Sequence, residues 1–284
     1  MSEYHHGHHH EHAHDHEHAH DHEHAHDHEH EEPMTQEEVV SSLLVLGEVA
    51  LGAHDYESAF DAYASVLKLE QNETALYNLG SLYARGVGVR RNYAEAAHLF
   101  HQAELMGNEQ AGKLCGKCMF DFVHEGFDSK TPAELYAAMV VFVLKVYPEA
   151  ADQKAEVKRG LFVIAATHYN KGEYAEAAKV FRAAAEFGND GYAQYYLAQL
   201  YNNGAGVAQN DLVSLYWLDC AVDNGAAEVA LDDRDGMLEA FHQSLTALEF
   251  RAAMEELATW CETGTPDVPA NADKAVRWHG VSQA

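Results

Sequence analysis

From about residue 37 onward, hydrophobic residues recur at the spacing i, i+3, i+4 and i+7 that is typical of amphipathic α-helices. The helical segments come in pairs, and Gly86 and Gly88 interrupt one pair with residues that adopt positive φ angles easily. Thr131-Pro132-Ala133-Glu134 combines an N-cap residue, a proline at the first helical position and a capping-box glutamate. The pattern predicts antiparallel helix pairs over most of the chain.

The helix pairs resemble one another. Residues 75–83 read Ala-Leu-Tyr-Asn-Leu-Gly-Ser-Leu-Tyr and residues 193–201 read Ala-Gln-Tyr-Tyr-Leu-Ala-Gln-Leu-Tyr, each followed by Gly-x-Gly-Val and a second helix. Most intervals between copies are close to the roughly 34 residues of helical hairpin repeats. One interval is longer, and it predicts an enlarged connection or longer helices around residues 120–155. We expect close helix crossings at the small residue of each first helix: Gly47, Gly80, Gly116, Ala166 and Ala198.

A single helix pair cannot bury its hydrophobic stripe on both sides, so the copies must stack on one another. The sequence therefore predicts an all-α fold. Residues 37–284 form an α-solenoid of stacked antiparallel helix pairs, and residues 1–36 form a separate tail.

At these motifs the chain resembles the Sel1-like repeat family, a relative of the tetratricopeptide repeats. The match covers residues 75–107 and 190–225 and, in part, 246–284, whereas residues 40–70 and 155–188 are more similar to plain tetratricopeptide copies. Residues 226–245 depart from the pattern. The resemblance implies an interaction adaptor whose first helices line a concave surface for a protein or peptide.

The positions that this resemblance implies for partner binding are aromatic, amide, hydroxyl and basic. They are Tyr77, Ser81, Arg85, Thr167, Lys171, Tyr195, Gln199 and Asn202. Together they would form a groove suited to an extended or helical peptide. The alternative is that each is an ordinary solvated position on a helix.

The tail has a different composition. Residues 1–38 contain 15 of the 22 histidines, 12 acidic residues and no Lys or Arg, and from His12 the sequence His-Ala-His-Asp-His-Glu occurs three times. Hydrophobic residues do not recur there, so we expect this segment to be disordered, ending near Pro33. Its candidate metal ligands are His5, His6, His8, His9, His10, His12, His14, His16, His18, His20, His22, His24, His26, His28 and His30.

Neutral imidazole favours Ni, Zn and Cu ions, and the interleaved carboxylates reduce the cost of concentrating dications. The tail is similar in composition to the His-rich tails of bacterial nickel and zinc metallochaperones. Three interpretations remain open: a physiological metal buffer or delivery segment, a tail whose metal binding is incidental, and an engineered tag.

The net charge of the chain limits the classes of partner that are expected. The formal net charge is −28, so binding to nucleic acid or an anionic membrane through clustered basic residues is not expected. The longest apolar run, Ala137–Leu144, is too short to cross a bilayer. The N-terminus resembles no secretory signal, and four cysteines do not make a disulfide framework, so we expect a cytoplasmic protein.

Catalytic motifs are not evident. Cys115-Gly-Lys-Cys118 could indicate zinc or redox chemistry, but in repeat register both cysteines fall on core positions, equivalent to Leu79 and Leu82. The histidines outside the tail are scattered, and His168 is expected to be a core or interface residue. The sequence contains no phosphate loop, serine elbow or HExxH motif. We therefore expect a non-enzymatic adaptor with a metal-binding tail, or alternatively a pure scaffold whose tail has no metal role.

Overall fold

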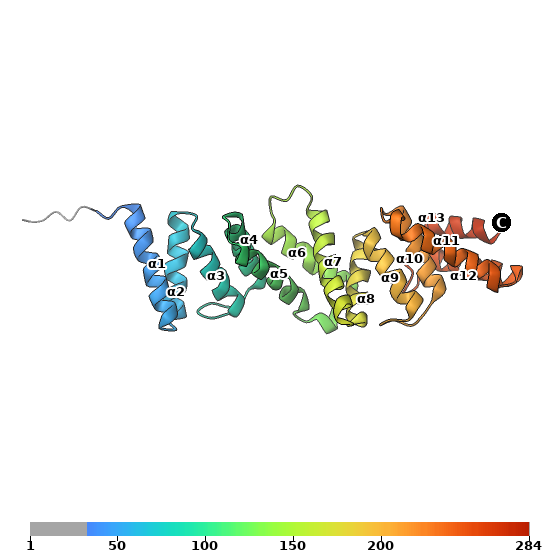
Figure 1. Ribbon diagram of the computed structural model, residues 1–284, viewed down its shortest axis with the longest axis horizontal. Coiled ribbons are helices and arrows are strands. Elements are labelled where there is room, and N and C mark those ends of the chain that lie inside the picture. The colour runs from blue at the N-terminus through green and yellow to red at the C-terminus, as the bar shows by residue number, and fades with distance from the viewer. Residues whose placement is uncertain (1–32, 284) are drawn as a thin grey trace, which may run out of the picture. The chain divides into compact units, whose positions relative to one another are not determined.

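The computed structural model describes residues 33–283, and every regular element in this range is helical. Residues Gln36–Ala284 group into one compact unit, in which the helices follow one another in chain order (Figure 1). The predicted α-solenoid is confirmed. The elements are α1 (Gln36–Gly52), α2 (Tyr56–Leu69), α3 (Glu73–Arg85), α4 (Tyr93–Leu105), α5 (Glu109–His124), η1 (Phe127–Ser129), α6 (Pro132–Val146), α7 (Gln153–Lys171), α8 (Tyr174–Arg182), η2 (Ala183–Phe187), α9 (Gly191–Asn203), α10 (Asp211–Asp223), α11 (Ala227–Ser244), α12 (Ala247–Thr263) and α13 (Ala272–Ser282).

Short polar side chains start most of these helices. The side chain of the N-cap residue accepts a hydrogen bond from the backbone N–H three residues later, which satisfies one of the unpaired donors of the first turn. The predicted capping box at Thr131 and Glu134 is present. The other residues that cap in this way are Asp55, Asn72, Asn92, Asn108, Asp152, Asp190, Asn210, Thr246 and Asn271.

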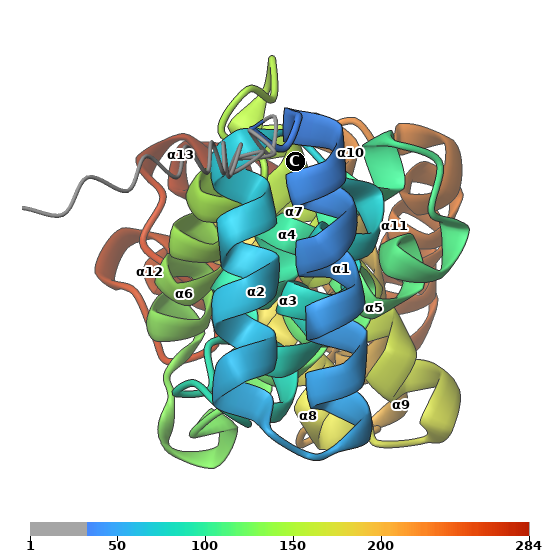
Figure 2. The same ribbon diagram turned by 90° about the vertical axis from the view of Figure 1, so that its left-hand side faces the viewer.

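Two of the predicted close crossings are confirmed. A Cβ on Gly47 would lie 2.6 Å from the ring of Tyr63, and one on Gly80 would lie 3.0 Å from Phe100. In each case the missing side chain lets the first helix approach an aromatic residue of the second. Figure 2 shows the first such pair, α1 and α2, side by side.

Three of the expected crossing residues lie in later copies, and two of them, Gly116 and Ala166, were predicted wrongly. Gly116 is exposed, with no atom within 4 Å of a Cβ built there. Ala166 is only partly buried, whereas its neighbour Ala165 is fully buried, so the alignment there is displaced by one residue. Ala198 is fully buried as expected. Sequence alignment alone could not detect these shifts, because the helices around them have different lengths.

The long interval between copies reflects longer helices and an added turn. Helices α5, α6 and α7 have 16, 15 and 19 residues, compared with 13 in α3 and in α4. The 3₁₀ turn η1 joins α5 to α6, and α8 continues directly into the π-helical segment η2. The prediction for residues 120–155 is confirmed.

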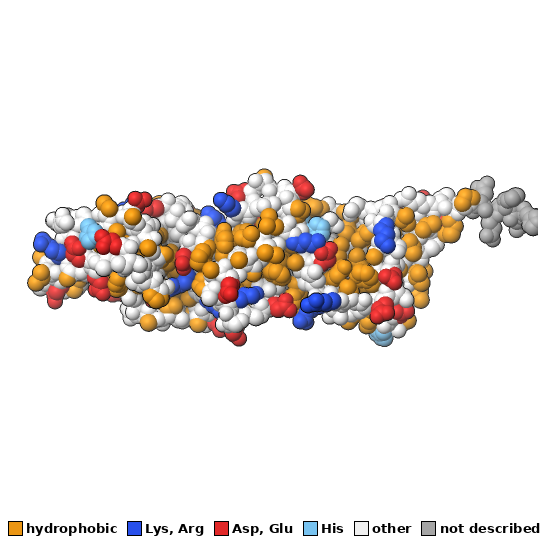
Figure 3. Space-filling model, turned by 180° about the vertical axis from the view of Figure 1, so that it is seen from behind, with side chains coloured by type: hydrophobic (Ala, Val, Ile, Leu, Met, Phe, Trp, Pro, Cys, Tyr) orange, Lys and Arg blue, Asp and Glu red, His pale blue; other side chains and the backbone are white. Residues whose placement is uncertain are grey.

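The number of buried positions per helix differs along the unit. Helix α10 is buried at nine consecutive positions, Val213–Ala221, because other helices surround it, whereas in α11 only Ala230 is buried. Acidic and basic side chains are scattered over the face seen in Figure 3, with hydrophobic side chains between them. Among residues 33–283, no helix combines the length and the hydropathy that crossing a membrane requires.

Candidate partner-binding surface

The eight predicted partner-binding residues lie on three first helices, α3, α7 and α9. On α3 and α9 their spacing of three or four residues places them on one side of the helix. Arg85 and Lys171 are exposed, and the other six are partly buried. The structure does not bring the three groups into one cluster, because each group belongs to a different repeat.

The residues on α3 contact their own repeat and the preceding one. The Tyr77 ring packs edge-on against Phe100, and the Ser81 hydroxyl donates to the Tyr77 carbonyl oxygen at 2.9 Å. The Arg85 guanidinium carbon lies 5.6 Å from the centre of the Tyr56 ring. Arg85 is therefore the residue of this group that is best placed to contact a partner.

The residues on α7 are also engaged. The Thr167 hydroxyl donates to the Val163 carbonyl oxygen at 2.7 Å, an ordinary bond within a helix. The Lys171 ammonium lies 5.2 Å from the centre of the Phe120 ring on α5. This contact leaves the charge of Lys171 exposed.

The residues on α9 form one wall of a pocket. The Gln199 side-chain amide donates to Asp233 Oδ2 at 2.7 Å, and the Tyr195 hydroxyl donates to the same oxygen at 3.2 Å. Asp233 belongs to α11, so this helix covers part of the face of α9 that was predicted to be open. The burial of Tyr195 and the hydrogen bond to Asp233 raise the pKa of the Tyr195 hydroxyl.

We call the cavity between α9, α10 and α11 the acidic pocket; its volume is about 420 Å³. Its lining residues are Gln199, Asn202, Asp211, Ser214, Leu218, Asp232, Asp233, Gly236, Met237, Ala240 and Phe241. Three carboxylates and no Lys or Arg line it, and no ion pair links Asp211 or Asp232 to a cation elsewhere in residues 33–283. Such a pocket favours a cationic group, and its apolar residues can contact an aliphatic stem.

Sequence reasoning found one wall of this pocket and missed the other. Gln199 and Asn202 were predicted from the repeat pattern, whereas Asp232 and Asp233 lie in the segment 226–245 that departs from it. The usable signal was the acidic composition of that segment. Its position against α9 could not be predicted without a repeat register.

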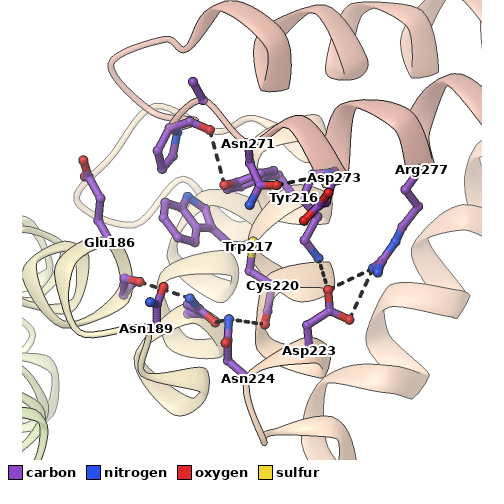
Figure 4. A pocket seen from close by; sticks show the side chains of 15 residues that line it. Glu186, Asn189, Tyr216, Trp217, Cys220, Asp223, Asn224, Asn271, Asp273 and Arg277 are labelled. Atoms are coloured by element: carbon purple, nitrogen blue, oxygen red, sulfur yellow. Dashed lines mark hydrogen bonds and ion pairs between the residues drawn. The ribbon is translucent and has the colours of Figure 1, made fainter. Parts of the chain in front are cut away.

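A second cavity, of about 340 Å³, lies on a different face of α10, beside the segment that leads into α13 (Figure 4). Hydrogen bonds close much of it. The Trp217 indole N–H donates to the Asp267 carbonyl oxygen at 3.2 Å, and Asn224 Nδ2 donates to Gln194 Oε1 at 3.1 Å. This cavity lies inside the contact between two helix pairs, and we call this contact the joint.

The charges at the edge of this joint are matched internally. Asp219 is 1% exposed and accepts hydrogen bonds from Lys274 at 2.6 Å and from Arg277 at 2.7 Å. Burial alone would raise the pKa of neighbouring Asp223, but hydrogen bonds from Lys274 and Arg277 hold it below 3.8. These basic groups are already paired, so the joint offers no free cation for an anionic ligand.

The cysteines of the CxxC motif belong to the core, as the repeat register predicted. Cys115 is 2% exposed and Cys118 is 3% exposed, and all four cysteines of the chain are free and buried. Burial and the neighbouring Cys115 raise the pKa of Cys118 to about 12. A thiol that stays protonated is a poor nucleophile and a poor metal ligand.

The predicted metal ligands of the tail, His5 to His30, lie outside the described residues. Within residues 33–283, no group of three or more His, Cys, Asp or Glu residues is arranged to hold a metal ion. The tail metal site therefore stays a prediction from sequence.

Three segments of the chain match the sequence model of the Sel1 repeat family: residues 74–108, 191–225 and 251–280. The first two correspond to the helix pairs α3–α4 and α9–α10, and the third lies within α12–α13. These three segments are therefore similar to Sel1 repeats, and they lie where the motifs predicted them. A search of curated protein sequences finds no match.

Several solved structures are similar to this chain. One is c5321, a protective antigen present in uropathogenic Escherichia coli strains that displays an SLR fold, with 20% identity over 86% of this chain and a TM-score of 0.27. A Sel1 repeat protein from Oxalobacter formigenes is 18% identical, with 88% of each chain covered and a TM-score of 0.25. A putative Sel1 repeat protein from Klebsiella pneumoniae subsp. pneumoniae is 17% identical over 70% of this chain and 92% of its own, with a TM-score of 0.27. The chain spans about half the length of c5321, 53%.

Proposed function

We propose that this chain is a non-enzymatic adaptor that binds a protein partner through a basic segment, and that its histidine-rich tail binds Ni, Zn or Cu ions. The observation that carries the first part is the acidic pocket, where Asp211, Asp232 and Asp233 meet beside an apolar surface. Sel1 repeats are consistent with a role in protein interaction.

The chemistry of the acidic pocket selects its occupant. A Lys or Arg side chain can place its stem against Leu218, Met237 and Phe241 and its charged head among the carboxylates. Asp233 is already held by Tyr195 and Gln199, so its carboxylate has a fixed position. Asp211 and Asp232 supply the unpaired acceptors.

A peptide library provides the test. Fluorescein-labelled peptides of one scaffold sequence, with Arg, Lys, Gln or Glu at the central position, are titrated with the full chain and followed by fluorescence anisotropy. Arg and Lys peptides should bind about tenfold more tightly than the Gln peptide, because each gains a charge-assisted hydrogen bond. Equal binding of all four peptides would refute the proposal.

Matched variants locate the binding. The double substitution Asp211→Asn with Asp232→Asn removes two negative charges from the pocket and should abolish the preference for Arg and Lys. Glu57→Gln with Asp61→Asn removes two charges from exposed positions on α2 and should leave it unchanged. If both variants lost the preference for Arg and Lys equally, the preference would reflect only the net charge of the protein.

The tail completes the proposal. Fifteen histidines and about four ligands per ion would allow several ions to bind, in sites that exchange readily and select poorly. The tail would then buffer metal or deliver it to the partner in the cytoplasm, where free buried thiols are maintained. The alternative is a pure scaffold in which the tail has no metal role.

Metal titration separates these alternatives. The comparison uses the full chain and a variant, called here the tail-Gln chain, in which all fifteen tail histidines are replaced by Gln. Isothermal titration with Ni²⁺ should show multiple sites in the natural chain that are lost in the tail-Gln chain. Metal content of the natural chain purified from its own cells then distinguishes a physiological metal role from an incidental one.

A further inference from the structure

Two histidines outside the tail, which the sequence pattern left scattered, face each other between helices. His124 ends α5 and His168 lies near the end of α7, and their Nε2 atoms are 2.7 Å apart. His168 is 4% exposed, and both rings line a pocket of about 600 Å³. From this geometry we propose that His124 and His168 bind one divalent transition-metal ion through their Nε2 atoms.

The other nitrogen of each ring determines where the protons lie. His124 Nδ1 is 2.7 Å from the Phe120 carbonyl oxygen, which can only accept, so His124 Nδ1 carries a hydrogen. His168 Nδ1 is 2.7 Å from Glu173 Oε2, and the ionised carboxylate also only accepts. In their neutral forms both rings therefore direct an Nε2 lone pair at the other. This contact requires a positive centre between the two nitrogens.

A metal ion fits this requirement. Histidines that bind metals almost always donate their other ring N–H to a carbonyl or carboxylate, as both rings do here. Zn–N bonds of 2.0–2.1 Å in tetrahedral geometry place two nitrogens roughly 3.3 Å apart, so the rings must separate by roughly 0.6 Å. Two imidazoles favour Zn, Ni or Cu over Mg or Ca.

Aromatic neighbours order the His124 ring. His124 stacks on Phe120, with ring centres 3.8 Å apart, and on Phe127, with ring centres 4.8 Å apart. Lys179 donates to the Phe127 carbonyl oxygen at 2.6 Å and lies over the ring of the same residue. The ligand on α5 is therefore fixed before a metal binds, which reduces the cost of ordering it.

The charge of the pocket also favours a cation. Asp128, Glu173 and Glu176 line it together with one basic residue, Lys171, so its carboxylates outnumber its cations. No third His, Cys, Asp or Glu in residues 33–283 joins the pair as a ligand. Because both rings line the pocket, the remaining coordination positions would face it and be open to water, which would make the site exchangeable.

This inference does not rest on the metal-binding tail, and the experiment is designed accordingly. Zn²⁺ is titrated into the tail-Gln chain in competition with a chromophoric chelator. One Zn²⁺ should bind per chain. Either His124→Gln or His168→Gln should weaken binding about tenfold or more, because a single imidazole remains. His98→Gln, which removes a partly buried histidine on α4, is the matched control and should bind as the tail-Gln chain does.

A second measurement covers the case in which a substitution perturbs folding. Long-range ¹H–¹⁵N spectra of the unsubstituted tail-Gln chain should show Zn²⁺ shifting the Nε2 signals of two histidines while their Nδ1 atoms stay protonated. Three outcomes would overturn the proposal: no Zn²⁺ binding, binding that survives both His124→Gln and His168→Gln, or Zn²⁺ shifts on other histidines. If a proton bridges the two Nε2 atoms and no metal binds, the result is the first of these outcomes, no Zn²⁺ binding. Failure of tail binding in the natural chain would leave this result unaffected.

Discussion

The backbone of Gly206 lies directly against the backbone of Tyr174, so that a Cβ on Gly206 would be 2.3 Å from the Tyr174 carbonyl carbon. The same relationship occurs in the other complete Gly-x-Gly-Val loop, where a Cβ on Gly88 would be 2.3 Å from the Tyr56 carbonyl oxygen. Both glycines have positive φ, 72° and 68°. The loop of one repeat therefore packs on the second helix of the preceding pair, which explains why the motif requires glycine.

Replacing Gly206 by Ala should lower the free energy of unfolding by at least about 2 kcal/mol, because backbone strain and an unrelieved contact add together. Gly172→Ala is the control, since Gly172 has a φ of 80° but no atom within 4 Å of the point where its Cβ would lie. Gly172→Ala should lower the free energy of unfolding by about 1 kcal/mol, because only the backbone strain is added. Urea denaturation measures both; equal losses would mean that the contact with Tyr174 adds nothing.

Removing the charge of Asp219 should destabilise the C-terminal repeats strongly. Asp219→Asn removes the buried carboxylate that Lys274, which is 5% exposed, shares with Arg277. Only the exposed Asp223 then remains to pair with both, at a cost of about 3 kcal/mol. Asp235→Asn breaks only an exposed pair with Arg234 and should change stability by less than about 0.5 kcal/mol. Thermal unfolding followed by circular dichroism compares the two. A small effect of Asp219→Asn would mean that α13 is not anchored by this cluster.

The cysteines should be unreactive in the folded protein. The pKa is about 12 for Cys118 and Cys261 and about 11 for Cys220, in each case mainly because burial disfavours the thiolate. Labelling with iodoacetamide at pH 8 should therefore be slow in buffer and fast in denaturant, where all four thiols titrate normally. Mass spectrometry counts the labels. Rapid labelling of Cys115 or Cys118 in buffer would reopen a redox role for the CxxC motif.

His279 should make the last helix pair more stable in mild acid. Hydrogen bonds to Glu262 and Glu255 raise the pKa of His279 above 6.5. A raised pKa means that the folded state binds the proton more tightly, so the stabilisation is fully present below pH 6.5 and is lost as the pH rises through the folded value.

An NMR titration of His279 measures this pKa, and Glu262→Gln should lower it. His279 lies at the contact between α12 and α13. His279→Gln should remove the part of the pH dependence of the free energy of unfolding that this histidine causes. His242→Gln, which removes an exposed histidine stacked on Phe250, is the control and should leave that dependence in place. A His279 pKa at or below 6.5 would contradict the prediction.

The paired helices and a few of their ends could be predicted from sequence. The capping box at Thr131 and the Gly-x-Gly-Val loops depend on residues a few positions apart, and local hydrogen bonds determine them. The core positions of Cys115 and Cys118 were also predicted correctly, because equivalent positions in different repeats are buried to a similar extent. The register failed at Gly116, where the following helix does not approach as it does at Gly80.

The surfaces that we propose as binding sites were predictable only in part. Gln199 and Asn202 were identified from their places on a first helix, but the carboxylates opposite them come from α11, which matches no repeat. A helix outside the repeat pattern has no template to give its orientation. Only its packing against α9 and α10 brings Asp232 and Asp233 to the pocket.

The sequence by itself determined the repeat architecture, a few helix ends such as the one at Thr131, and the presence of a histidine-rich tail, because these depend on periodicity, local capping and composition. Tertiary structure alone decided which distant side chains meet: His124 with His168, 44 residues apart, and Asp219 with Lys274, 55 residues apart. The physical reason is that such contacts depend on how helices of unequal length cross and on the connections between them. Those crossings are set by the packing of whole helix faces, which no short stretch of sequence contains.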